Sequence, residues 1–191
     1  MRARTDARAP SGGHRPVSVF VDESKARDYL LIAAAMDFRG LTESRRAVRS
    51  LLLPGQPRLH MKQENETRKR LLLDTFAALD VTVTIFRAPR GLGSEVVRRR
   101  RCLEELVLAI GDAGGRLCLE RDETLVARDK QCIIETARRA GSAGALEYWH
   151  ESAASEPLLA VPDAVGWAWA RGGDWRRCAL PMISAVIDVD A

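Results

Sequence analysis

The order of apolar and polar side chains predicts that the folded part of the chain begins with two strands. Val17, Val19 and Val21 recur at every second position, as in a strand, and this run ends in Asp22-Glu23-Ser24. Residues 28–37 (DYLLIAAAMD) are apolar almost throughout, which is typical of a strand buried on both faces. The first strand therefore carries an acidic group to its C-terminal end.

Helical and strand-like patterns alternate over the rest of the chain. The expected helices cover about 42–53, 64–79, 95–111, 126–140 and 157–171, with Thr42 as the N-cap of the first and Pro54-Gly55 as its end. Further strands are expected at 81–87, 116–122 and 145–149, an extended piece at 57–62, and an edge strand or irregular segment at 182–190. This order predicts one α/β domain over residues 17–191, a mixed central β-sheet flanked by α-helices.

Positive charge is concentrated at the N-terminus. Residues 1–16 hold four arginines and one aspartate, which accounts for three of the four net positive charges of the 191-residue chain. The same segment is rich in Pro, Gly and Ser and has no apolar period, so we expect a flexible basic arm. The body of the chain is nearly neutral, and a polyanionic partner must be argued from local clusters of cations.

Composition excludes several other classes of protein. The longest apolar run, residues 29–36, is far shorter than the ~20 residues of a membrane-spanning helix, so we expect no membrane contact and a cytoplasmic location. The four cysteines are far apart and form no CxxC pair, which argues against a zinc or redox motif. With 46% hydrophobic residues the chain can form a substantial core.

Three acidic residues interrupt apolar patterns and are the candidates for chemistry. Asp22 ends the first strand, where α/β sheets place ligand-binding groups, although a turn with local hydrogen bonds would also use Asp and Ser there. Glu120 lies within the strand RLCLERD, where a salt bridge to an exposed arginine is the alternative. Asp163 shares a helical face with Leu159 and Trp167, so a metal ion, an arginine or an N-cap role beside Pro162 must compensate its charge.

Three isolated acids on two strands and a C-terminal helix suggest hard oxygen ligands for Mg²⁺ or Mn²⁺. Two such ions lie about 3.5 to 4 Å apart in phosphodiester hydrolysis, so the carboxylates of Asp22, Glu120 and Asp163 are expected within about 8 Å of one another. The other conspicuous residues have structural interpretations. Arg98 to Arg101 fan around a helix, and Trp167 belongs to the apolar stripe of the core.

The segments VFVDES, RLHMK, LCLERDE and SEPLLAVPDAVGWAWARGGDW resemble, in this order, the domain-of-unknown-function 3800 (DUF3800) family. The resemblance covers roughly residues 17–185 and implies an RNase H-like fold with an acidic site like that of RNase H-type nucleases. On matching positions it implies Asp22, Glu120 and Asp163 as catalytic metal ligands. It also matches His60 and Lys62 to a His and a Lys of the family.

His60 could position a phosphate or transfer a proton, and a structural histidine is the alternative. A fourth acid is not singled out, because Glu23, Glu64, Glu66 and Asp122 compete for that role. We therefore expect a divalent-metal-dependent nuclease or phosphotransferase acting on nucleic acid, DNA or RNA. The alternative is a catalytically inactive RNase H-like binding or scaffold module with a protein partner in a larger complex.

Overall fold

The computed structural model describes residues 17–25, 27–111 and 114–190; the predicted basic arm, residues 1–16, lies outside them. Within this part of the chain one mixed sheet has the strand order β5-β4-β1-β2-β3-β6. The strands are β1 (Val17–Ser24), β2 (Tyr29–Asp37), β3 (Val81–Ala88), β4 (Gly115–Glu120), β5 (Leu146–Glu151) and β6 (Ile183–Asp188). The segment 182–190 thus contributes an edge strand, one of the two expected outcomes.

The strand directions follow from the connections. β1 and β2, joined by a short turn, are antiparallel, and so are β2 and β3, whose connection contains α1 and α2. β4 pairs with β1, β5 with β4, and β6 with β3, all in parallel, after connections that contain helices. β1 therefore lies in the middle of the sheet, with β2 on one side and β4 on the other.

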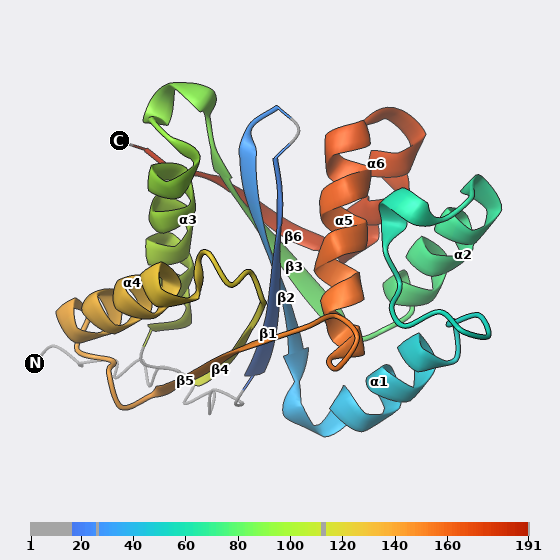
Figure 1. Ribbon diagram of the computed structural model, residues 1–191, viewed down its shortest axis with the longest axis horizontal. Helices are drawn as coiled ribbons and strands as arrows, with labels where there is room; N and C mark the ends of the chain where they lie inside the picture. Colours follow the sequence, from blue (N-terminus) through green and yellow to red (C-terminus); the bar gives the residue numbers. More distant parts are fainter. Residues whose placement is uncertain (1–16, 26, 112–113, 191) are drawn as a thin grey trace, which may run out of the picture.

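Helices cover both faces of the sheet (Figure 1). On one face lie α3 (Glu95–Ile110) and α4 (Val126–Arg139), and on the other lie α1 (Leu41–Arg49), α2 (Glu66–Ala77), α5 (Ala160–Arg171) and α6 (Gly173–Ala179). Short 3-10 turns precede or follow them: Phe38–Gly40, Met61–Gln63, Arg90–Leu92, Pro157–Leu159 and Leu180–Met182. The expected mixed sheet flanked by helices is confirmed.

Each face of the sheet has its own core. Phe20 of β1 and Cys118 of β4 pack on the side of α5, whereas Val19 and Val21 pack on the side of α3. The alternation follows from the two-residue period of a strand. Asp22 and Glu120 lie two positions after Phe20 and Cys118. They are therefore on the same face of the sheet as these residues, the face that α5 covers.

Helix α5 approaches the sheet closely because Gly166 has no side chain. A Cβ at this position would lie 2.7 Å from Cδ1 of Ile32 and 3.5 Å from Cβ of Ser24. Ile32 is fully buried in β2, so it has little room to move. Asp163 lies one helical turn before Gly166, and this close packing brings it toward the end of β1.

Some expected boundaries were wrong. α1 begins at Leu41 with Gly40 at the N-cap, because a 3-10 turn runs directly into it, and it ends at Arg49. Thr42 therefore does not cap it. α6, a short helix that begins at Gly173 with Gly172 at its N-cap, was not anticipated. α5 begins at Ala160 and passes through Pro162, which the first turn tolerates because its missing N–H would have no helical acceptor there.

No helix in the described ranges is both long and apolar enough to cross a membrane. The three cysteines that the structure buries, Cys102, Cys118 and Cys132, are free thiols whose pKa is raised by burial. Cys178 is also a free thiol but is only partly buried.

A buried ion-pair network joins β1 to the α3–α4 face. Arg99 of α3 is 5% exposed and donates two hydrogen bonds of 2.8 Å to the two carboxylate oxygens of Asp129. Its Nη1 donates to Glu23 at 2.5 Å and to the Tyr29 hydroxyl at 3.0 Å. His150 of β5 lies 3.0 Å from Asp129. Arg99 thus compensates two carboxylates away from bulk water.

We expect Arg99→Met to lower the free energy of unfolding by about 3 to 5 kcal/mol, since it leaves Asp129 and Glu23 without their counter-charge. Arg100→Met is the matched control: Arg100 is the next residue of α3 but is 47% exposed, and its loss should cost under about 1 kcal/mol. Urea unfolding followed by circular dichroism measures both values. Equal values for the two variants would show that the network does not stabilise the fold.

Candidate active site

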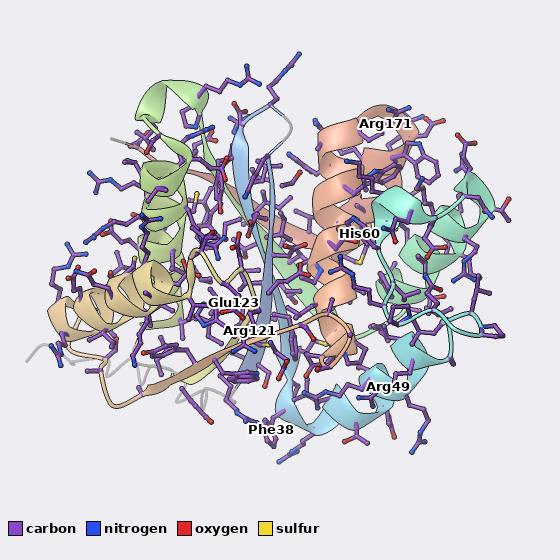
Figure 2. The ribbon with its side chains drawn as sticks, viewed as in Figure 1. Phe38, Arg49, His60, Arg121, Glu123 and Arg171 are labelled. Carbon is purple, nitrogen blue, oxygen red and sulfur yellow. The ribbon has the colours of Figure 1, made fainter. Side chains whose placement is uncertain are left out.

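An open cleft of about 650 Å³ lies between the C-terminal ends of β1 and β4 and the helix α5. The residues that line it come from these three elements, from the β1–β2 turn and from the segment before α2. They are Asp22, Glu23, Ser24, Lys25, Arg58, His60, Lys62, Glu120, Asp163, Trp167, Ala170 and Arg171. We call this hollow the acidic cleft. Figure 2 shows His60 beside α5 and Arg171 at the end of that helix.

Two of the three acids are brought together by strand register. β1 and β4 run parallel with Val21 opposite Leu119, so the next residues, Asp22 and Glu120, lie side by side at the point where the pairing of these two strands ends. Both are partly buried. Asp22 Oδ1 also accepts a hydrogen bond of 2.7 Å from the backbone N–H of Glu23, the kind of local contact that a turn would use.

The Asp22 carboxyl group is in a position that disfavours its charged form. Burial raises its pKa well above the usual value, and the negative charges of Glu120 and Asp163 raise it further. A side-chain hydrogen bond with Glu120 raises this pKa as well. Glu120 and Asp163 are therefore close enough to Asp22 for their negative charges to repel its ionised form.

Asp163 holds the segment before α2 in place. Its Oδ2 accepts a hydrogen bond of 2.8 Å from the backbone N–H of Met61 and lies 3.2 Å from Nδ1 of His60. The N-cap role that the sequence left open is wrong, because the N-cap residue of α5 is Leu159. The hydrogen bond with Asp163 raises the pKa of His60, although burial opposes this shift.

Residues 58–62 supply the basic side of the cleft by alternation. Leu59 and Met61 are buried in the core, while Arg58, His60 and Lys62 line the cleft. Arg58 donates a hydrogen bond of 2.9 Å from Nη1 to Oε1 of Glu120. The salt bridge to an exposed arginine, weighed for Glu120 from the sequence, is therefore present, since Arg58 is 42% exposed.

Sequence reasoning did not single out Arg58 or Arg171. The two-residue alternation of RLHMK was a usable signal for Arg58, because it places Arg58 on the same side as His60 and Lys62. Trp167, expected in the core, packs against it but is only partly buried and lines the cleft as well. Its ring meets that of Trp175 edge to face, with 5.1 Å between the centroids.

Of the four candidates for a further acid, only Glu23 lines the cleft. Glu64 is held by Arg68 and Gln56, Asp122 accepts from Thr124, and Glu66 starts α2. Within the described residues, no three Asp, Glu, His or Cys side chains are arranged so as to enclose a metal ion. Arg58, His60 and the Met61 N–H are the present partners of Glu120 and Asp163.

No protein-family model matches the chain, and no curated protein sequence matches it either. Among solved structures, the RNase HII of a PCNA:RNase HII complex from Archaeoglobus fulgidus is similar, with a TM-score of 0.56 and 10% identity. The match covers 81% of this chain and 73% of that one. Bst-RNase HIII, solved with Mn²⁺, matches with a TM-score of 0.47 and 14% identity over 87% of this chain and 57% of that one. The fold of this chain is RNase H-like.

We expect Asp22→Asn to leave the melting temperature in EDTA unchanged or to raise it. The raised pKa means that the native state binds this proton more tightly than the unfolded chain, so stability falls as pH rises from the usual aspartate pKa through the raised value. The uncharged amide of Asp22→Asn does not lose stability in this way. The melting temperatures at pH 5 and pH 8 should therefore differ less in the variant than in the wild type.

Asp122→Asn is the control for this experiment. Asp122 is near Glu120 in the chain, but hydrogen bonds from Thr124 lower its pKa, so its loss should leave stability unchanged or reduce it. Thermal melts of the three proteins in EDTA make the comparison. A clear loss of stability in Asp22→Asn would mean that Asp22 is a favourable structural partner and not a repelled charge.

Proposed function

We propose that this chain is a divalent-metal-dependent nuclease or phosphotransferase that acts on nucleic acid, with Asp22, Glu120 and Asp163 as the ligands of Mg²⁺ or Mn²⁺. The observation that carries the proposal is the position of Asp22, a partly buried carboxyl group with a raised pKa that lies beside two others in an open cleft. A protein that only needed stability would pair or replace such a group.

The donor set fits a hard cation. Carboxylate oxygens are the ligands that Mg²⁺ and Mn²⁺ prefer, and a bound cation would relieve the repulsion that raises the pKa of Asp22. Glu120 would exchange its present contact with Arg58 for the ion, whereas the contacts of Asp163 with His60 and Met61 occupy only its Oδ2. When bound, such ions activate water and stabilise the charge that develops on a scissile phosphate.

The cleft residues themselves would bind and orient the substrate. Lys62 and Arg171 are exposed and line the cleft, so they can neutralise phosphate oxygens. His60 is oriented through Nδ1 by Asp163, and its raised pKa favours the form that holds a proton on Nε2. That proton could be donated to a phosphate oxygen in the cleft.

The RNase H-like fold favours this function over other functions of an acidic cleft. RNase HII and RNase HIII are the proteins of the similar structures, and the first is in complex with PCNA. For this chain we propose nucleic acid, DNA or RNA, as the substrate, and we retain membership of the DUF3800 family as a prediction. A protein partner belongs to the alternative below.

The alternative is a binding or scaffold module that has the fold without turnover. It is favoured by the contacts that Glu120 and Asp163 already make, since Arg58, His60 and Met61 N–H satisfy part of their hydrogen-bonding capacity. The two functions predict different results when the protein is incubated with a labelled oligonucleotide and Mn²⁺: the nuclease hydrolyses it and the scaffold module does not. A metal response without any hydrolysis would support the scaffold.

We expect Mn²⁺ to stabilise the wild type by about 2.7 kcal/mol at a hundredfold excess over Kd, because only the native state holds the three acids together. Asp22→Asn should lose most of this gain and all hydrolysis of labelled DNA or RNA oligonucleotides. Melting curves with EDTA and with Mn²⁺, and a gel assay, measure both effects. An undiminished Mn²⁺ response in the variant would exclude Asp22 as a ligand.

A further inference from the structure

A second hollow adjoins the acidic cleft at the end of α5. It has a volume of about 280 Å³ and is lined by Arg27, Asp28, Leu30, Arg87, Trp169, Ala170 and Arg176. We call it the arginine pocket. Ala170 also lines the acidic cleft, so the last turn of α5 is the boundary between the two hollows. The turn that joins β1 to β2 and the C-terminal end of α5 lie at the same end of the molecule (Figure 1).

The three arginines come from three separate elements. Arg27 lies in the turn between β1 and β2, Arg87 in β3, and Arg176 in α6. Residues distant in the sequence therefore meet at one place through the fold. None of the three belongs to the acidic cleft itself, so the pocket is an extension of that cleft with its own side chains.

Two of the guanidinium groups are fixed in the same manner. Arg87 donates from Nε and Nη2 to the two carboxylate oxygens of Asp188 at 2.5 and 2.8 Å. Arg176 donates from Nε and Nη2 to the backbone oxygen of Trp169 at 3.2 and 2.8 Å, and it lies 4.3 Å from the centre of the Trp169 ring. In both arginines, no described residue accepts a hydrogen bond from Nη1, so the N–H groups of Nη1 are available to a ligand.

The charge of the pocket is positive. Asp28 is the one acid among the seven lining residues, and Asp188 pairs with Arg87 from outside the pocket, so three arginines against two carboxylates leave one net positive charge. The Arg27 side chain, which is exposed, has no hydrogen bond or ion pair to any described residue. Arg99 of the buried network, by contrast, has its charge fully compensated by carboxylates. The arginine pocket is therefore able to accept an anion.

We propose that the arginine pocket binds a backbone phosphate of the nucleic-acid strand whose reacting phosphate lies in the acidic cleft. The inference rests on the proposed function and extends it to a second contact on the same strand. The planar guanidinium with paired N–H donors matches the geometry of a phosphate group. Contacts of this kind position the strand and carry no information about its sequence.

The test is oligonucleotide binding in EDTA, followed by fluorescence anisotropy, so that it does not depend on metal or on turnover. Arg27→Ala and Arg176→Ala are each expected to weaken binding about five- to tenfold at low salt, equally for two unrelated sequences. Each should also reduce the slope of log K against log salt concentration by about one. Arg177→Ala is the matched control, since Arg177 is exposed on the same helix but pairs with Asp174 and lies outside the pocket.

The outcomes separate the inference from the proposed function. If the wild type binds and both pocket variants bind as well as Arg177→Ala, the arginine pocket is not a phosphate site, while the proposed function stands. If the wild type binds no DNA or RNA oligonucleotide, single-stranded or duplex, both are overturned. Arg176 also contacts Trp169, so its loss could weaken binding through a change in packing. Arg27 is exposed, so the binding affinity of Arg27→Ala tests the phosphate contact without a change in packing.

Discussion

The parallel pairing of β1 with β4 is the constraint on which the site depends. With Val21 opposite Leu119, each strand adds one more residue beyond its apolar run, and these residues are Asp22 and Glu120. Two acids that are 98 positions apart in the sequence then become neighbours without any loop to position them. The third acid comes from α5, whose depth against the sheet is set by packing. The carboxylates are thus held by the rigid core of the domain.

The carboxyl groups on the two faces of β1 have opposite electrostatic surroundings. Glu23 and Asp129, on the side of α3 and α4, share the guanidinium of Arg99. Asp22, one residue before Glu23, instead meets two further carboxylates, and its pKa is raised. The fold therefore provides a guanidinium for the carboxylate of Glu23, whereas the carboxyl group of Asp22 faces the charges of Glu120 and Asp163. This contrast is the physical reason for assigning chemistry to one face and stability to the other.

The sequence predicted most of the elements and the acids, because both leave local signals. Period-two valines and an apolar run gave the two central strands, and a charge within an apolar helical stripe identified Asp163. The positions of His60 and Lys62 came from the family resemblance. The contacts of Arg58 with Glu120, and the meeting of Arg27, Arg87 and Arg176, depend on which strands become neighbours. Chain order does not contain that information. The helix α6 was not predicted; only Gly172, which caps the end of α5 and the start of α6, separates the two helices.

The residue at position 166 sets how close α5 lies to the sheet, and with it the width of the acidic cleft. Any side chain there would have to displace the buried Ile32 or lift α5 from the sheet, and Asp163, on the same rigid helix, would move with it. One position outside the cleft thus sets the spacing between the acid of the helix and those of the strands. Divergent chains with this fold could therefore change the spacing between Asp163 and the two acids of the strands by exchanging a single hydrogen atom for a methyl group, with all three acids retained.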